Sequence, residues 1–158
     1  MTGENEMAKI TEAQRTEVSA FLKKHTTLTI ATVDREAWPQ AASLFYVSDD
    51  ALNLYWVSGE KSRHSQNLER VSRVAISMHN ETWDWRDIQG VQIDGQARRL
   101  IDPDETDRAW ALFRDKFPFT AEFVDQIARS SFYTLAPKWI RLIDNSKEFG
   151  HREEFTLP

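Results

Sequence analysis

The stretch LYWVSGEKSRHSQN, Leu54–Asn67, says more about the fold than any other part of the sequence. Its first five residues form an apolar, aromatic run that favours a strand and ends in Ser58. The polar segment Ser58–Asn67 follows at once and is typical of the beginning of a helix. The stretch therefore predicts a strand that turns directly into a helix.

This turn also has the composition of an anion site. Across Ser58–Arg73 there are four Lys or Arg residues against two acids, in a chain whose formal net charge is −5. The first turn of a helix has free N–H groups and the positive end of the helix dipole, and hydroxyl and guanidinium groups add donors that suit phosphate. A solvated surface helix of mixed charge is the alternative, and the pattern alone favours that alternative.

Apolar and alternating runs predict further strands on both sides of the turn. The polar Ser48–Asp50 would join the second and third strands as a hairpin, and Gly90 and Gly95 would let the fifth strand bend or bulge. The last strand contains Pro137, which could interrupt it. The predicted strands are Thr26–Val33, Pro39–Val47, Leu52–Val57, Val71–His79, Ile88–Leu100 and Phe132–Asp144.

Helices are expected before, between and after these strands. Thr11 and Gln14 have the spacing of a capping box, Glu60–Arg70 is short and polar, and Asp102–Glu105 combines a capping Asp with Pro in the first turn. Thr120 would cap a further short helix. Because the strands follow one another without alternating strand–helix–strand units, they predict a small antiparallel barrel with helices packed outside.

The composition excludes several classes of protein. A hydrophobic content of 41% in 158 residues suits one domain with one core, and the absence of cysteine excludes disulfides and thiol chemistry. The negative net charge argues against binding to nucleic acid, and no apolar run reaches the roughly 18 residues of a membrane span. Met1–Lys9 lacks the apolar stretch of a signal peptide. We therefore expect a cytoplasmic protein with a poorly ordered segment 1–10 and one domain, 11–158.

Several separated segments resemble one known family. Pro39–Tyr46, Leu54–Ser58 and Lys61–His64 are similar to the FMN-binding split barrels related to pyridoxamine 5′-phosphate oxidase, in which a strand ending in Ser or Thr precedes a Ser-Arg-Lys motif. Gly90–Leu100 and Asp144–His151 resemble the YhbP-like branch. The resemblance implies a mainly β (α+β) fold, a six- to seven-stranded antiparallel split β-barrel with flanking helices, and a homodimer with the cofactor at its interface.

The resemblance also implies roles for individual residues. The residues expected around the FMN phosphate are Ser58, Lys61, Ser62, Arg63 and His64. Those expected along the flavin ring are Ala42, Ser43 and Leu44, with Trp56 and Val57 on the neighbouring strand. Those expected to approach the same cofactor from the partner chain are Gln96, Trp139 and Arg141.

The chain departs from the pattern of the oxidase itself. The oxidase has an Arg early in its second strand and a Lys at the end, where this chain has Ala42-Ser43 and Tyr46-Val47, and the Lys of Ser-Arg-Lys is His64. The substrate-phosphate residues of the oxidase have no convincing counterpart. The resemblance therefore predicts an FMN-binding oxidoreductase with an unknown small-molecule substrate, and it does not predict pyridoxamine phosphate oxidation.

Other ligands and functions remain as alternatives. Members of the superfamily also bind F420, haem or no cofactor, so another flavin, F420, haem and a non-catalytic binding module are kept, with His151 or His64 as the axial ligand of a haem. The histidines show no metal-binding spacing, and no metal site is expected. Trp83–Trp85 lies in a polar loop and would either cover a pocket or lie at a dimer contact. Ser43, Ser62 and Ser65 lack a nucleophile-elbow context, so a hydrolase is not expected.

Overall fold

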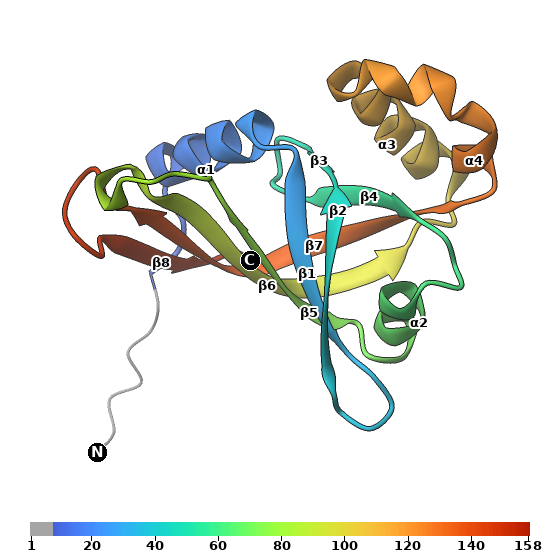
Figure 1. The fold of residues 1–158 in the computed structure, drawn as a ribbon, viewed down its shortest axis with the longest axis horizontal. Helices are drawn as coiled ribbons and strands as arrows, with labels where there is room; N and C mark the ends of the chain where they lie inside the picture. The colour runs from blue at the N-terminus through green and yellow to red at the C-terminus, as the bar shows by residue number, and fades with distance from the viewer. Residues whose placement is uncertain (1–7) are drawn as a thin grey trace.

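The structure is a computed structural model that describes residues 8–158, and it consists of a curled sheet with helices at its edges (Figure 1). Within these residues the helices are α1 (Glu12–Lys24), α2 (Arg63–Arg70), α3 (Pro103–Lys116) and α4 (Val124–Ala128), with short 3₁₀ turns η1 (Trp85–Asp87) and η2 (Pro118–Glu122). The strands are β1 (Thr27–Val33), β2 (Pro39–Phe45), β3 (Val47–Ser48), β4 (Leu54–Ser58), β5 (Arg73–His79), β6 (Gln89–Arg99), β7 (Ser131–Asp144) and β8 (Arg152–Thr156).

The strands form one antiparallel sheet in the order β2-β1-β5-β6-β7-β4-β3, with β8 added beside β7. This confirms the predicted mainly β, antiparallel split barrel with flanking helices. The eighth strand lies in the C-terminal tail, where the polar sequence gave no strand signal. Of the expected poorly ordered segment 1–10, residues 1–7 lie outside the described part of the chain. Ile10 N donates to Thr156 O at 3.2 Å, so the described end of that segment runs beside β8.

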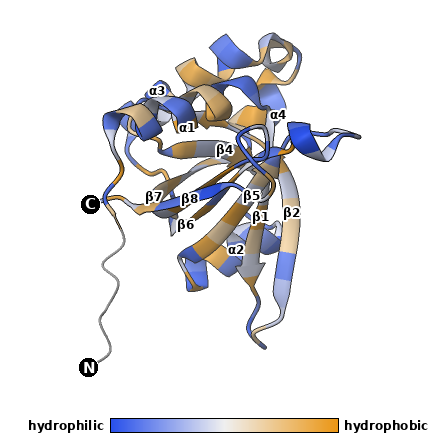
Figure 2. Ribbon diagram, turned by 90° about the vertical axis from the view of Figure 1, so that its left-hand side faces the viewer, coloured by the Kyte–Doolittle hydropathy of each residue, from blue (hydrophilic) through white to orange (hydrophobic). Residues whose placement is uncertain are grey.

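Two apolar clusters hold the fold together. The larger fills the curl of the sheet beneath α1 and includes Val18, Ile30, Trp56 and Ile93, all with no exposed surface. The smaller lies under α3, where Phe113 and its neighbours pack against the far side of β4 and β7. By contrast α2, whose sequence is RHSQNLER, is drawn almost wholly as hydrophilic (Figure 2). This helix covers one open end of the barrel, where Leu68 enters the inner core and the other side chains are polar.

One glycine and one proline set the bend between β6 and β7. The register shifts at Asp94/Gly95, where Gly95 pairs with Pro137 and Asp94 pairs with Trp139, so Lys138 is the extra residue of a β-bulge. A Cβ at position 95 would collide with the backbone oxygen of Ala136. The predicted bulge at Gly95 is confirmed, and Pro137 does not interrupt β7 because it sits at this bulge.

The predicted hairpin between Pro39–Val47 and Leu52–Val57 is wrong for most of its length. β2 pairs with β1 along its full length, and only Val47 and Ser48 pair with β4. The chain changes direction at Tyr46, whose hydroxyl donates to Leu22 O at 2.8 Å and whose ring is fully buried. The buried tyrosine therefore separates two strands that the sequence pattern joins.

The helix starts follow their predicted signals with one exception. Thr11 and Gln14 form the capping box of α1, and the Asp102 side chain accepts hydrogen bonds at the start of α3. Thr120 does not cap a helix: it lies inside η2, where its hydroxyl donates to Phe117 O at 2.7 Å. No helix within residues 8–158 is long and apolar enough to cross a membrane.

Candidate functional site

The predicted strand-to-helix turn is present, and Ser62 organises it. β4 ends at Ser58, the chain turns through Gly59, and Ser62 is the N-cap of α2. Ser62 N donates to Gly59 O at 3.0 Å, and Ser62 Oγ accepts from Ser65 N at 3.3 Å. The cap occupies one of the free donors of the helix, and the remaining ones belong to the start of a helix with no acid in its first turn.

Ser58, Ser62 and His64 form a hydrogen-bonded cluster at this helix start. His64 Nε2 lies 2.6 Å from Ser58 Oγ and 3.1 Å from Ser62 Oγ, and the two hydroxyls are 3.2 Å apart. Ser62 donates its proton to Ser65 Oγ at 2.8 Å. Burial lowers the pKa of His64 and so favours the neutral imidazole, whose Nε2 accepts or donates in these contacts according to its tautomer.

A groove of about 690 Å³ opens beside this cluster, between the start of α2 and strand β2. Arg63 and His64 line it on the helix side, and residues Pro39 to Ala42 line it on the strand side. Within the described residues β2 pairs only with β1, so one row of its main-chain N–H and C=O groups has no strand partner. The groove thus lies between the start of a helix and an open strand edge.

Side-chain amides form the inner wall of the groove. Asn67 Nδ2 donates both to Thr32 Oγ1 and to Gln40 Oε1, each at 3.1 Å. Because Gln40 Oε1 is held in this way, its Nε2 is left as a buried donor with no partner within residues 8–158. A buried amide N–H without a partner costs free energy unless an acceptor reaches it.

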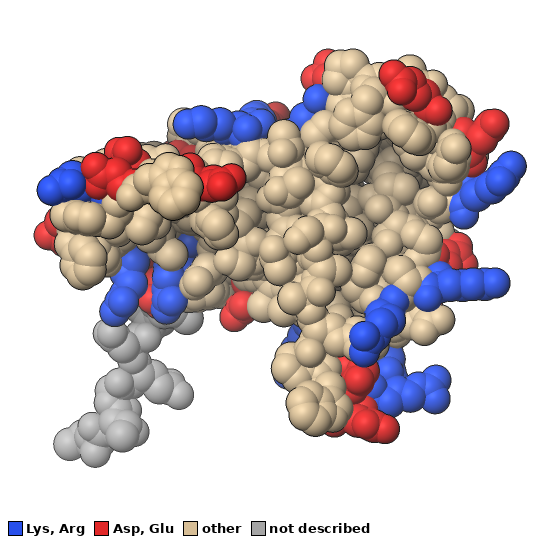
Figure 3. All heavy atoms as spheres, in the orientation of Figure 1, with Lys and Arg blue, Asp and Glu red and all other residues tan. Residues whose placement is uncertain are grey.

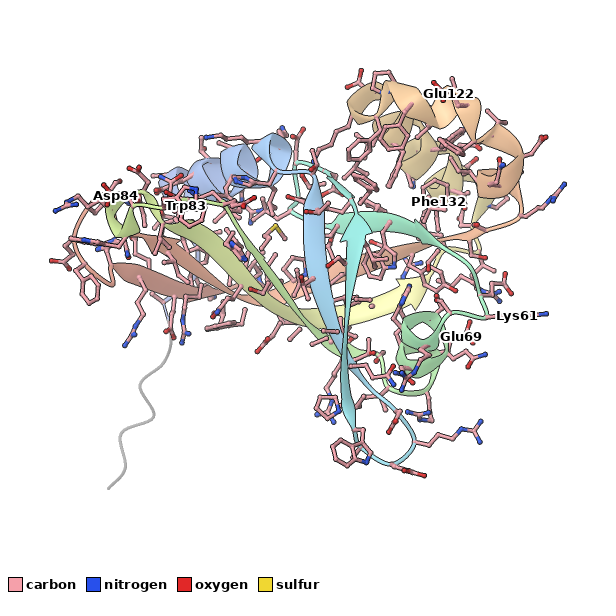
Figure 4. All side chains as sticks on the ribbon, viewed as in Figure 1. Lys61, Glu69, Trp83, Asp84, Glu122 and Phe132 are labelled. Carbon is pink, nitrogen blue, oxygen red and sulfur yellow. The ribbon has the colours of Figure 1, made fainter. Side chains whose placement is uncertain are left out.

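The structure brings some of the predicted site residues together at this groove. Ala42, Arg63 and His64 line it directly, and Ser58 and Ser62 are bonded to His64. Lys61 lies at the tip of the β4–α2 loop, and its side chain extends away from the body of the protein (Figure 4). Arg63 is therefore the cation nearest to the cluster that also faces the groove.

The other residues predicted along the ring occupy different environments. Ala42 and Leu44 pack against the inner core while Ser43, between them, is exposed on the outer face of the sheet. Trp56 is fully buried and stacks with Tyr133 at a ring separation of 6.1 Å. Val57 packs against the cluster under α3. In the free protein, the Trp56 ring does not reach the groove.

The three residues predicted to act across a dimer lie on the outer side of β6 and β7 and do not line the groove of their own chain. Arg141 forms an ion pair with Glu154 at 2.7 Å, and its guanidinium lies 5.1 Å from the Trp139 ring centre. Gln96 lines a separate pocket of about 280 Å³ that also contains Tyr55. These three residues could contact the groove only from a second chain.

Several residues of the groove had no role predicted from the sequence. Thr32, Asp34, Trp38 and Gln40 line the groove but received no predicted role. The alternation of β2 supplies the signal for Gln40, because it places this amide on the same side as Ala42 and Leu44. The loop residues Asp34 and Trp38 gave no such signal. Trp83 is fully exposed at the opposite end of the molecule from Lys61, so its loop does not cover this groove within one chain (Figure 4).

The fold and groove define an antiparallel split barrel with a groove and the N-terminus of α2 at its open end. A family model described as pyridoxamine 5′-phosphate oxidase matches residues 15–144. A UPF0306 protein from Klebsiella pneumoniae is 30% identical over 131 residues, covering 82% of this chain and 84% of that protein. The UPF0306 protein YhbP from Escherichia coli O157:H7 is 28% identical over 139 residues, covering 87% and 89%. The chain belongs to the pyridoxamine 5′-phosphate oxidase family and, within it, to the YhbP-like branch.

Solved structures of similar fold bind different groups. HutZ, the haem storage protein from Vibrio cholerae, has a TM-score of 0.67 and 20% identity, with 78% of this chain and 89% of that chain covered. A haem-binding protein from Mycobacterium smegmatis has a TM-score of 0.73 and 19% identity, covering 94% and 59%. A FAD-binding protein from Mesorhizobium loti has a TM-score of 0.63 and 17% identity, covering 88% and 92%. At these identities the likeness establishes the fold alone.

Proposed function

We propose that this protein binds FMN, with the phosphate at the start of α2 and the flavin ring in the groove along the edge of β2. The observation that carries the proposal is the Ser58–Ser62–His64 cluster, which places two hydroxyls and an imidazole within 3.2 Å of one another at a helix N-terminus that opens into a groove. The family membership and a FAD-binding structural neighbour support a flavin.

The donor set fits a phosphate monoester. The helix start provides N–H groups, Ser58 and Ser62 provide hydroxyls, and Arg63 provides a guanidinium that forms no ion pair within residues 8–158. A phosphate dianion beside His64 would favour the protonated imidazole, in which Nε2 is a donor. Lys61 would have to swing back towards the helix to take part.

The groove wall fits the edge of a flavin ring. Its floor consists of Thr32, Gln40 and Ala42, and Trp38 lies at its outer margin. The flavin pyrimidine edge carries carbonyl and N–H groups, which suit the unpaired main-chain groups of β2 and the unpartnered Nε2 of Gln40. Ala42 supplies a small side chain that leaves room for the ring.

The outer face of the sheet supports a homodimer. The register aligns Ala41, Ala31 and Ala75 in one row across β2, β1 and β5, and Ser43, Thr29 and Ser77 in the next. These side chains are exposed, and the face over β1 and β2 carries almost no charge, with Lys, Arg, Asp and Glu at its margins (Figure 3). A flat, charge-poor face of small side chains suits close packing against a second copy. The rows continue to Asp94–Trp139 and Gln92–Arg141, so Trp139 and Arg141 would belong to this contact.

A bound flavin would supply the capacity for hydride or electron transfer. The protein would anchor the phosphate, orient the ring and exclude water from one ring face. His64 lines the groove and has a lowered pKa, but this proposal places its imidazole against the phosphate, so we assign no catalytic residue. An oxidoreductase with an unknown small-molecule substrate and a non-catalytic flavin-binding protein both follow from this arrangement; steady NAD(P)H consumption separates them.

Haem is the second candidate ligand, because two structural neighbours are haem proteins. The geometry favours flavin over haem. His64 uses Nε2 for the two serines, and His151 lies far along the chain with Glu148 at 3.7 Å and Glu153 at 3.5 Å. A Soret band on haem addition that disappears in His64→Ala or His151→Ala would reverse this preference.

The direct experiment is the visible spectrum of the protein purified without added cofactor, followed by titration with FMN and riboflavin. We expect a flavin spectrum or micromolar FMN binding, with riboflavin much weaker because it lacks the phosphate. A colourless protein that also fails to bind added FMN overturns the proposal.

A further inference from the structure

A second groove, of about 730 Å³, adjoins the first on the other side of the same arginine. The two grooves share Asp34, Gln40 and Arg63. Both volumes fall within the roughly 300–1,000 Å³ that small-molecule sites occupy. A ligand whose phosphate sits at Arg63 could therefore extend in two directions, with its ring in the first groove and a further group in the second.

The second groove is lined by three acids and three arginines, and only some of them are paired with another group. Of its three acids, Asp34 Oδ1 accepts from the backbone N–H groups of Glu36 and Trp38 at 2.9 and 3.0 Å, and Glu69 faces Arg99 at 4.0 Å. The side chains of Arg35, Arg63 and Glu36 form no ion pair or hydrogen bond within residues 8–158. The side chains left without such a partner are thus two guanidinium groups, one on each side of the groove, and one carboxylate.

Hydrogen bonds within the β1–β2 turn hold the backbone of Arg35 in place. Asp34 N donates to Trp38 O at 3.0 Å, and Ala37 N donates to Asp34 O at 3.1 Å. Together with the two bonds to the Asp34 carboxylate, these contacts give the turn one defined conformation. On the opposite wall, Arg70 is held by a 2.8 Å hydrogen bond from its guanidinium to Val33 O. The groove is therefore formed by two braced elements, the turn and the outer side of α2.

We propose that this second groove binds the adenylate part of FAD, so that the protein prefers a dinucleotide flavin over FMN. The inference rests on the proposed function, because the shared FMN half must occupy the first groove. The second phosphate of FAD would reach the guanidinium groups of Arg63 and Arg35, which can hold phosphate oxygens through paired hydrogen bonds. The adenine would lie between Arg35 and the exposed amide of Gln66, since guanidinium planes stack on purines and an amide pairs with their edges.

The test compares the affinities of FMN and FAD for the full chain, by quenching of flavin fluorescence, in wild type and three single variants. Arg35→Ala and Gln66→Ala remove second-groove groups that do not line the first groove. Arg129→Ala, an exposed arginine at the end of α4, is the matched control. Far-UV circular dichroism and the melting temperature of each variant establish that it is folded.

We expect FAD to bind at least about tenfold more tightly than FMN, and Arg35→Ala to weaken FAD about tenfold while leaving FMN within twofold. Gln66→Ala should weaken FAD severalfold, and Arg129→Ala should change neither flavin. Equal affinities of wild type for FMN and FAD, or equal losses for both in Arg35→Ala, overturn the inference and leave FMN binding intact. Failure of both flavins to bind overturns the proposed function itself.

Discussion

Ser58 and His64 are joined by a 2.6 Å hydrogen bond between Oγ and Nε2, although one ends a strand and the other lies in the first turn of the following helix. The bond closes the β4–α2 turn and holds the imidazole at the mouth of the groove. Its direction depends on the tautomer of the neutral imidazole, because Nε2 either accepts the Ser58 proton or donates its own. Protonation of His64 makes Nε2 a donor in either case, which is what a phosphate oxygen requires.

The first prediction is that FMN affinity depends on pH through His64. Burial lowers the pKa of His64 in the free protein, and a bound phosphate raises it, so binding is accompanied by proton uptake. The contribution of His64 to affinity is therefore complete below the free-state pKa and is lost as pH rises through the bound-state pKa. Titrations of FMN from pH 5.5 to 8.5 should show affinity falling with pH in wild type.

His64→Gln supplies the control for this pH dependence. It keeps a hydrogen-bonding side chain but cannot titrate, and the ionisation of the FMN phosphate itself affects both proteins equally. The difference between wild type and His64→Gln should shrink as pH rises, and His64→Lys should hold FMN across the whole range. Parallel pH profiles for wild type and His64→Gln would remove His64 from the phosphate site.

The second prediction is that Arg63 and Lys61, which have the same predicted role, differ in their effect on FMN affinity. Arg63 faces the groove, whereas Lys61 extends into solvent. Arg63→Ala should lose a charged hydrogen bond worth roughly 1.5–3 kcal/mol, which is about 10- to 100-fold in FMN affinity. Lys61→Ala should change affinity less than threefold. The reverse order of effects in calorimetric titrations would mean that the β4–α2 loop closes over the ligand.

These two residues show what the sequence could predict about the site and why. The strand-to-helix turn follows from local signals, namely an apolar run and a polar break, and the structure has this turn, although α2 begins at Arg63 and not at the predicted Glu60. The direction of the Lys61 side chain is set by the geometry of the loop, and the local sequence does not predict that direction. Gln40 belongs to the groove through its contact with Asn67, which lies 27 residues further along the chain. A contact at that separation becomes visible only when α2 is placed against β2.

The fold was predictable to a similar extent. The order of most elements along the chain, the cap of α3 and the bulge at Gly95 all have local causes. The pairing of β2 with β1 instead of β4 has a tertiary cause, because the buried Tyr46 hydroxyl needs the Leu22 carbonyl as acceptor. β8 is stabilised by its pairing with β7. Its polar sequence has little strand propensity, so the sequence did not predict this strand.

The third prediction concerns two glycines with opposite surroundings. A Cβ at Gly95 would meet the Ala136 carbonyl oxygen and the Leu135 side chain, whereas a Cβ at Gly59 would meet nothing within 4 Å. Gly95→Ala should lower the free energy of unfolding by roughly 1–3 kcal/mol, since the bulge backbone must shift. Gly59→Ala should leave stability within about 0.5 kcal/mol. Urea unfolding of both variants checks this, and an unaffected Gly95→Ala protein would contradict the bulge geometry.

The fourth prediction concerns a lysine that joins α3 to α1. Lys116 Nζ donates to His25 O at 2.6 Å and to Leu22 O at 3.1 Å, and it lies 4.4 Å from the Tyr46 ring centre. Burial lowers its pKa to about 8. Because the folded-state pKa is below the unfolded value of about 10.4, the unfolded chain binds more protons between these two values. Stability attributable to Lys116 should therefore rise with pH, by about 1–2 kcal/mol between pH 8 and pH 9.5.

The measurement is urea unfolding at pH 7, 8, 9 and 9.5 for wild type and Lys116→Met. Met fills a similar volume without a charge, so the difference in unfolding free energy between the two proteins should change in favour of wild type as pH rises. Tyrosines that ionise at higher pH are common to both proteins and cancel in the comparison. A difference that stays constant with pH would mean that the Nζ keeps its ordinary pKa in spite of its burial.

The fifth prediction tests whether the site needs a second chain. Ala31 lies at the centre of the outer sheet face, paired with Ala41 on one side and Ala75 on the other, so a long charged side chain there would keep two flat faces apart. Ala31→Lys should convert a dimer into a monomer in sedimentation velocity at micromolar concentration, while Ala111→Lys, on the exposed side of α3, should not. If Trp139 and Arg141 of the partner complete the site, Ala31→Lys should also weaken FMN binding at least about tenfold, although position 31 does not line the groove. A monomeric wild type would remove the dimer, and a monomeric Ala31→Lys protein with unchanged FMN affinity would place the whole site within one chain.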